Sequence, residues 1–553
     1  MARYRDSVPT ILLIAAMAVS AAVLLYFTSK LTFLLDDWDF LLHRRGVSPG
    51  VFLDPHNEHI SVAPVLVYKA IQAGIGMESL LPYAVASTAV FLTGVALLFT
   101  YLQRRVGGWL ALAAVAPILF FGSAAEDLLT PFQIGYFGSV ACGIGMLLAF
   151  DREDDRGDLL ACVLLVGSLT FSSLGLPFLA GAAVQTAIGR DRRRRAYVVL
   201  VPAALYAIWW LGWGHTAKND FTFGNLATSP SYVLDGFASS LSSLLGLASP
   251  RDEMAVVSVD WGRPLLVGAL VIVAVRLRRL GRVPDRLWVV AVIAIAFWFL
   301  AGLSATQDFR APTVSRYQFV GAVLILLIAA ELARGLRPGT RVVVIALALA
   351  GAATLSNFDY LHGAYVNQKY ASAVVRGDLA GLDITADRVL PGFYLNPRNS
   401  NFQYFREIDA GSYISATEKF GSPAYDTQEL LSAPQPARLA ADMVTAAALG
   451  IRLYRGVAPP RSASCRVVDA LPAGTPAAEL GPGAYFLRNR SPQSADIHLA
   501  RYSDAVSVGL GQMRPGVEAA LRIPADRSQQ LWRLVLQNAG PGPGRFSLCS
   551  AGT

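Results

Sequence analysis

The feature that most constrains this chain is a series of long apolar stretches. About eleven segments approach the roughly 20 apolar residues that a helix needs to cross a bilayer, namely 9–29, 79–101, 107–122, 132–150, 159–173, 174–189, 196–214, 262–277, 286–303, 315–334 and 340–356. The 553-residue chain is 54% hydrophobic and only 16% charged, whereas soluble domains carry roughly 25% charged residues. We therefore expect a polytopic α-helical membrane protein with about eleven transmembrane helices.

Basic residues indicate the sidedness of these stretches. They gather at Arg3 and Arg5, at Arg104 and Arg105, from Arg190 to Arg195, from Arg276 to Arg282 and from Arg334 to Arg341. If 159–189 is a hairpin of two spans, these clusters occupy alternate connections, which the positive-inside rule places in the cytoplasm. The N-terminus is then cytoplasmic, and the loops 30–78, 215–261 and 304–314 and the C-terminal segment are external or periplasmic.

The same clusters account for the formal net charge of +8, so nucleic acid is not an expected partner, and the lipid bilayer is. A high content of Ala, Arg and Gly is typical of a bacterium with a GC-rich genome. We expect a multi-pass protein of the bacterial plasma membrane, and protein partners are not predicted.

The composition changes near residue 357, which divides the chain into a membrane domain, 1–356, and an exported part. Segment 357–455 is mixed, with helical spacing from about 427 to 450. Segment 456–553 contains short alternating stretches such as "GAYFLRN" and "LWRLVLQN" between Gly and Pro turns, which predicts an α+β or β-sandwich domain. Cys465 and Cys549 bracket this segment, and an exported compartment permits a disulfide between them.

The exported domain is a candidate for binding the acceptor glycan. Three aromatic residues in its predicted strands, Tyr485, Tyr502 and Trp532, could stack on sugar rings, although burial in a core is the alternative.

The first external loop begins with the acidic segment "LLDDWDF". Asp36 and Asp37 directly follow the first span, and adjacent carboxylates at a low-dielectric boundary raise each other's pKa, which suits a general base. Asp39 is a candidate for binding substrate. The alternative is that Asp37 or Asp39 caps the helix that follows.

The same loop carries "PHNEHI", in which His56 and His59 flank Glu58. These side chains could bind a phosphate, hold a sugar or ligate a metal. Structural histidines are the alternative, and metal binding is the weaker option because no third and fourth ligand at fixed spacing is visible.

This arrangement resembles the GT-C superfamily of integral-membrane glycosyltransferases, which use polyprenyl-phosphate sugars as donors. The resemblance rests on the acidic pair of "LLDDWDF" at the outer end of an N-terminal span, the long first external loop, about eleven spans and a final exported domain. Protein O-mannosyltransferases, aminoarabinose transferases and cell-wall arabinosyltransferases belong to this group. The resemblance implies that Asp36, with Asp37 beside it, occupies the catalytic position.

A polyprenyl-phosphate donor requires cations at the outer ends of the spans. Arg310, Arg316 and Tyr317 precede or begin the tenth span, and Lys69 is a further candidate. Interfacial anchoring is the alternative for the Arg–Tyr pair. The external stretch "EDLLTPFQIGYFG" supplies Glu126, Asp127, Gln133 and Tyr136, which could line an acceptor groove or serve as ordinary loop residues.

The predicted reaction is a single displacement that inverts the anomeric centre. Asp36 accepts the proton of the acceptor hydroxyl, and Arg316 and Arg310 stabilise the departing polyprenyl phosphate. The acceptor is an envelope glycan, lipid or protein. This scheme requires no cofactor, with a divalent metal as a less favoured addition. A transporter or flippase of lipid-linked saccharides is the competing interpretation, and an anchored glycan-binding module is a third.

Overall fold

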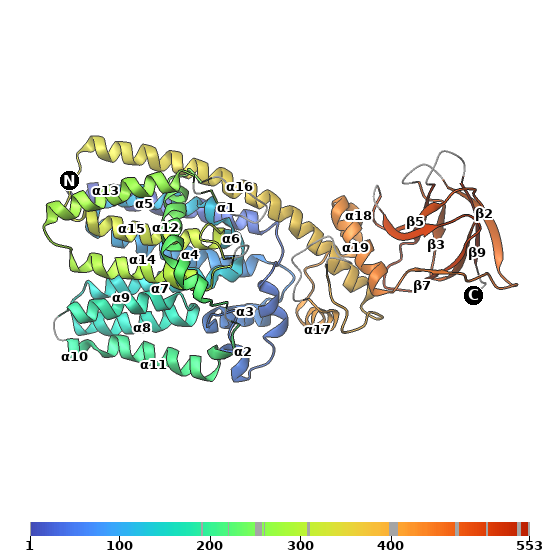
Figure 1. The fold of residues 1–553 in the computed structure, drawn as a ribbon, viewed down its shortest axis with the longest axis horizontal. Helices are drawn as coiled ribbons and strands as arrows, with labels where there is room; N and C mark the ends of the chain where they lie inside the picture. The colour runs from blue at the N-terminus through green and yellow to red at the C-terminus, as the bar shows by residue number, and fades with distance from the viewer. Residues whose placement is uncertain are drawn as a thin grey trace. The chain divides into compact units, whose positions relative to one another are not determined.

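A computed structural model describes residues 2–189, 192–218, 220–248, 257–258, 260–306, 310–396, 408–470, 475–504, 507–538 and 544–550. The chain forms two compact units (Figure 1). The helical unit comprises Met1–Lys30, Arg44–Ile71 and Leu80–Gln368, and the C-terminal unit comprises Leu31–His43, Gln72–Ser79 and Lys369–Thr553.

The helical unit is a bundle in which α4, α7, α8, α9, α14 and α15 run side by side (Figure 1). Its main helices are α1 (Ala2–Thr28), α3 (Val62–Gly74), α4 (Leu81–Val106), α5 (Gly108–Val115), α7 (Ile134–Phe150), α8 (Asp155–Phe171), α9 (Gly175–Ile188), α11 (Tyr197–Gly212), α12 (Phe223–Leu244), α13 (Gly262–Leu280), α14 (Asp285–Leu303), α15 (Ser315–Ala333) and α16 (Thr340–Thr385). Its shorter helical pieces are α2 (Pro49–Leu53), η2 (Pro117–Phe120), η3 (Gly122–Ala124), α6 (Ala125–Leu129), η4 (Pro131–Gln133), α10 (Arg192–Arg195) and η5 (Gly214–Thr216), whereas η1 (Asp39–His43) belongs to the C-terminal unit.

Every predicted apolar stretch is helical, but the stretches differ in length and polarity. Among the described residues, 7 helices are long and apolar enough to cross a membrane, or up to 8 if a bent pair counts as one span. That pair, Gly108–Phe120 and Gly122–Leu129, is bent by 46°. The fold class is therefore a polytopic helical membrane protein, with fewer helices meeting the length and composition criteria than the eleven expected.

Helix α12 was not expected, because residues 215–261 were predicted to form an external loop. Thr222 caps its N-terminus by accepting a hydrogen bond from the backbone N–H of Asn225. Its buried face consists largely of Ser, Gly and Ala, and Gly236 and Gly321 leave no room for a side chain beside Trp298. Small residues allow close helix packing in membranes, yet they lower the hydropathy by which spans are recognised.

Buried aromatic and ionic contacts hold the bundle together. Ring centroids of Phe91 and Phe137, and of Phe137 and Phe319, are 5.0 Å apart, which joins α4, α7 and α15. Near the predicted cytoplasmic ends, Arg105 pairs with buried Glu331. Asp151, at the end of α7, lies 3.2 Å from Arg105 and 3.0 Å from Arg286, so these charges compensate one another inside the protein.

In the C-terminal unit, the last turns of α16 pack against α17 (Ala410–Phe420), α18 (Thr427–Ser432) and α19 (Gln435–Ala448). Gly377 and Gly381 of α16 allow the backbone of α19 to approach at Ala437 and Ala441. Helix α16 continues without interruption through the change of composition near residue 357.

The remainder of this unit is a β domain of two antiparallel sheets, in the orders β1-β7-β4-β9-β2 and β3-β8-β5-β6. The strands are β1 (Leu453–Arg455), β2 (Ser464–Ala470), β3 (Ala478–Leu480), β4 (Gly483–Asn489), β5 (Ala495–Ala500), β6 (Val508–Met513), β7 (Glu518–Ile523), β8 (Trp532–Asn538) and β9 (Gly544–Ser550). Leu487, Leu521, Leu534 and Phe546 from both sheets share one core, as in a β-sandwich.

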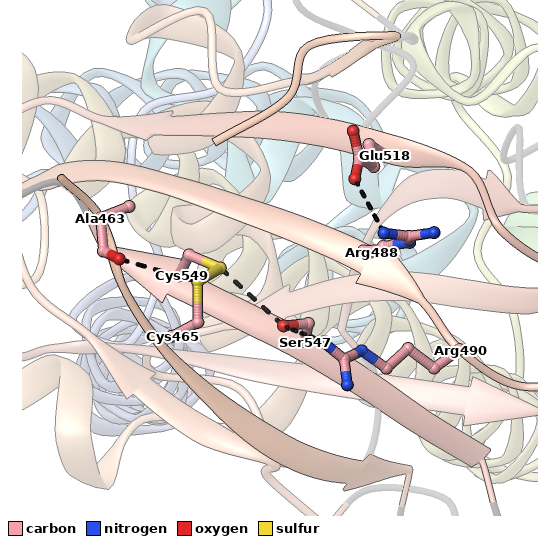
Figure 2. Close-up of a disulfide and its surroundings, with 7 residues drawn as sticks. All are labelled: Ala463, Cys465, Arg488, Arg490, Glu518, Ser547 and Cys549. Carbon is pink, nitrogen blue, oxygen red and sulfur yellow. Dashed lines mark hydrogen bonds and ion pairs between the residues drawn. A yellow bond between two sulfur atoms is a disulfide. The ribbon is translucent and has the colours of Figure 1, made fainter. Parts of the chain in front are cut away.

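A disulfide joins Cys465 on the edge strand β2 to Cys549 on β9 (Figure 2). The prediction that Tyr502 and Trp532 could stack on sugars was wrong, because both side chains are buried in the protein interior. Tyr485 is partly buried against the same core, and its hydroxyl donates to the carbonyl of Gly481.

Candidate functional site

The acidic segment that follows α1 belongs to the C-terminal unit and forms a tight turn. Asp37 is buried, its carboxylate accepts a hydrogen bond from the backbone N–H of Leu34 at 3.1 Å, and its own N–H donates to the carbonyl of Leu34. Asp36, the preceding residue on the turn, is only partly buried. The two carboxylates predicted as a pair therefore have different surroundings.

Aromatic packing fixes the position of this turn. The indole N–H of Trp38 donates to the carbonyl of Phe33 at 3.1 Å, and the buried ring contacts Phe33 and Tyr413 edge-on. Asp39 begins η1 and lies 3.3 Å from His43 of the next turn. Asp39 thus lies beside an imidazole within its own helix.

His56 and His59 belong to the helical unit and form a small bridge. The backbone N–H of each donates to the carbonyl of the other, at 3.0 and 2.9 Å. The His56 ring packs on Phe132 at 4.9 Å between centroids, and the His59 ring lies edge-on to Tyr136 at 6.0 Å. Among the described residues, no group of three or more His, Cys, Asp or Glu side chains could hold a metal ion.

Glu58, between these histidines, forms an ion pair with Arg310. Asp220 lies 3.7 Å from the same guanidinium. Burial disfavours the charge of Arg310, but the hydrogen bond and negative charge of Glu58 outweigh it and raise the pKa of the guanidinium above its usual value. Arg310 therefore keeps its positive charge in a partly buried position.

Arg316, in the first turn of α15, forms a second ion pair. Its guanidinium lies 3.3 Å from the carboxylate of Glu126 on α6 and 5.6 Å from the ring centroid of Tyr317. Lys69, the remaining predicted phosphate ligand, instead donates to the carbonyl of Arg44 at 2.8 Å and lies over the ring of Phe52. The arginines and Lys69 thus have different surroundings.

Asp127 is the most unusual member of this region. Its side chain is completely buried, and neither carboxylate oxygen has a hydrogen-bond partner among the described residues. Glu126 and Arg316 are close enough to act on it electrostatically. Asp127, Glu126 and Arg316 also act on Tyr136, which places these four side chains in one neighbourhood.

Helix α12 contributes Tyr232, which lies in a segment that the sequence predicts to be a loop and is not among the predicted site residues. Its hydroxyl donates to the carbonyl of Arg310 at 2.9 Å, and it interacts electrostatically with Tyr317, Arg316 and Tyr136. We name this set the arginine cluster: Glu58, Glu126, Asp127, Tyr136, Tyr232, Arg310, Arg316 and Tyr317. All of its members lie in the helical unit.

Comparisons with known proteins identify structures but no sequence family. No protein-family model matches the chain, and no curated protein matches it. Two solved structures of ArnT from Cupriavidus metallidurans are similar, one in the apo state and one bound to undecaprenyl phosphate. Each is 12% identical with a TM-score of 0.44 and covers 76% of this chain, which corresponds to 90% of the apo chain and 91% of the bound one.

Proposed function

We propose that this protein is a glycosyltransferase that moves a sugar from a polyprenyl-phosphate donor to an envelope glycan, lipid or protein acceptor on the external face, with inversion. The observation that carries the proposal is the arginine cluster. Arg310 and Arg316 lie just before and at the start of α15, and each pairs with a carboxylate from a distant segment. Charged groups at such positions are costly and usually serve function.

The proposed role of Arg310 and Arg316 is to bind the donor phosphate. Guanidinium groups match phosphate oxygens geometrically and form strong charge-assisted hydrogen bonds with them. In the cluster these donors are directed at Glu58 and Glu126. Binding would exchange carboxylate oxygens for phosphate oxygens, and release of the product would restore the ion pairs.

Asp36 is proposed as the base that accepts the proton of the acceptor hydroxyl. Asp37 already accepts a hydrogen bond from its own turn, and Asp36 is the more exposed of the two residues. A base placed in this way is typically worth about 10²–10⁴-fold in rate. The acceptor oxygen forms a bond to the anomeric carbon as the bond between that carbon and the phosphate oxygen breaks. The phosphate leaves as an anion that guanidinium groups can stabilise without a metal.

A transporter or flippase of lipid-linked saccharides is the alternative, and one observation favours it. The segment Gly108–Leu129 is bent by 46° between its two halves, and the second half carries the buried Asp127. Discontinuous helices with buried polar groups are typical of transporters, in which they occur at corresponding positions of two repeats. Among the described residues only this one bent pair is found.

The experiment that tests the proposal uses the purified full-length protein in detergent, where no gradient exists. It is incubated with undecaprenyl-phosphate sugars and an extract of envelope acceptors, and release of undecaprenyl phosphate is measured. Release that depends on acceptor, and falls in the Arg316→Ala variant, supports a transferase. Binding of the lipid without any release, together with movement of the lipid across proteoliposomes, would favour the transporter.

A further inference from the structure

The outer face of the five-stranded sheet carries an aromatic residue and two arginines in a row along β4. Side chains alternate between the faces of a strand, and Leu487 and Asn489 are buried. Phe486 and Arg488 therefore lie on the opposite face. Arg490 continues this row, since its backbone N–H donates to the carbonyl of Arg545 and extends the pairing with β9.

The residues beside this row are small. Phe486 is flanked by Ala520 on β7 and Cys549 on β9, and Arg488 is flanked by Glu518 and Ser547. Because Ala520, Ser547 and Cys549 have small side chains, the phenyl ring of Phe486 and the two guanidinium groups extend beyond them on this face. Figure 2 shows Arg488, Arg490, Ser547 and the disulfide gathered on this face.

Two neighbouring hollows result from this arrangement. One, of about 340 Å³, is lined by Arg488, Asn489, Arg490, Ser491 and Gly516. The other, of about 110 Å³, has Phe486, Arg488, Arg490, Glu518, Ser547 and Cys549 in its lining. Arg488 and Arg490 border both, so a ligand that bridges the two hollows contacts both guanidinium groups and reaches the ring of Phe486.

The charge of these hollows is positive. Glu518 lies 3.5 Å from Arg488 and compensates one arginine. Arg490 has no ion-pair partner among the described residues, and its Nη2 donates only a long hydrogen bond of 3.4 Å to the hydroxyl of Ser547. The guanidinium group has five N–H donors, so Arg490 retains donors for an anion.

We propose that this face of the β domain binds an acidic saccharide, with an anionic group on Arg490 and Arg488 and a sugar ring against Phe486. Arginine binds carboxylate and phosphate groups through paired hydrogen bonds, and an aromatic ring supplies a rigid apolar surface beside them. The hollows are open and bordered by polar groups, as a hydroxyl-rich ligand requires. This inference rests on the β domain alone and does not depend on the proposed transfer reaction.

The test measures binding to the purified full-length protein with three probes: trigalacturonate, which is acidic, maltotriose, which is a neutral saccharide, and tripolyphosphate, which is an anion without a sugar. We expect trigalacturonate to bind at least 10-fold more tightly than maltotriose. Arg490→Gln should weaken trigalacturonate binding at least 10-fold. Phe486→Ala should weaken trigalacturonate binding and leave tripolyphosphate binding unchanged.

The matched control is Arg388→Gln, which removes one charge from an exposed arginine elsewhere in the same unit and should change affinity less than twofold. An intact disulfide and an unchanged melting temperature verify that each variant is folded. The proposal is overturned if trigalacturonate does not bind, if Arg490→Gln and Arg388→Gln have equal effects, or if Phe486→Ala weakens both anions alike. If the full-length protein binds trigalacturonate but shows no transfer activity, only the proposed function is contradicted.

Discussion

The guanidinium of Arg316 lies 3.3 Å from the carboxylate of Glu126, although 190 residues separate them in the chain. Both side chains are about one-quarter exposed, so the pair is accessible enough to exchange partners. A phosphate that replaces Glu126 would supply the negative charge that the partly buried guanidinium of Arg316 requires.

This relationship predicts opposite effects for the two partners on lipid-phosphate binding. Arg316→Ala should weaken undecaprenyl phosphate about 10- to 100-fold, because a charge-assisted hydrogen bond worth about 1.5–3 kcal/mol is lost. Glu126→Gln removes the competing carboxylate and should leave affinity unchanged or raise it a few-fold. The affinities of both variants are measured from the binding of labelled undecaprenyl phosphate to the protein in nanodiscs. Equal weakening by the two substitutions would show that the ion pair itself is needed to shape the site.

Asp127 supplies a prediction that separates stability from function. A buried carboxylate without hydrogen bonds costs free energy, so Asp127→Asn should keep or raise the melting temperature by a few degrees. Because Asp127 acts electrostatically on Arg316, the proposed phosphate ligand, the same change should lower transfer at least 10-fold. The control is Asp158→Asn, which breaks a 2.6 Å ion pair with Arg195 and should lower the melting temperature without a specific loss of transfer. A lower melting temperature for Asp127→Asn would show that Asp127 stabilises the bundle.

Much of the fold could be predicted because membrane helices leave a strong local signal. Stretches such as 79–101 and 315–334 are predominantly apolar, and they correspond to the helices Leu81–Val106 and Ser315–Ala333. Helix α12 could not be predicted in this way, since its buried residues include Ser239, Ser240 and Ser242. These residues stabilise the helix by close packing, which depends on the facing helices and is invisible in a hydropathy average.

The candidate site was only partly predictable for the same reason. Arg310 and Arg316 are recognisable as charges next to an apolar stretch, and Glu58 as a carboxylate between two histidines, which are local properties. Their pairing is not, because Glu58 and Arg310 are 252 residues apart and meet only through helix packing. The contact of Tyr232 with Arg310 could not be predicted from the local sequence, since it depends on helix α12, in a segment predicted to be a loop.

The disulfide between Cys465 and Cys549 should stabilise the β domain. It links residues that are 84 positions apart, and closing a loop of that length stabilises the folded state by about 4.5 kcal/mol in the chain-entropy model. Changing both cysteines to Ala should increase amide hydrogen exchange in β2 and β9, with little change in the helical unit. Mass spectrometry under non-reducing conditions checks the pairing in protein isolated from cells. Changing Cys142, which is a free cysteine, to Ala should have no such effect, and unchanged exchange in the double variant would contradict the prediction.

The last prediction concerns the turn from Leu34 to Asp37 and separates a base from a structural carboxylate. Asp36→Asn keeps the shape of the side chain but cannot accept a proton, so turnover should fall about 10²-fold or more while undecaprenyl-phosphate affinity persists. Asp37→Asn retains an oxygen that can accept the Leu34 N–H bond and should have a smaller effect.

Asp37→Ala completes this series, because it removes the acceptor of the Leu34 hydrogen bond altogether. Leaving a partly buried N–H unsatisfied costs about 1–3 kcal/mol, so this variant should lower the melting temperature, unlike Asp36→Asn. Turnover, lipid affinity and melting temperature are measured on the same preparations. Undiminished turnover in Asp36→Asn would remove that residue from catalysis, and equal losses of stability in Asp36→Asn and Asp37→Ala would show that both carboxylates serve the turn.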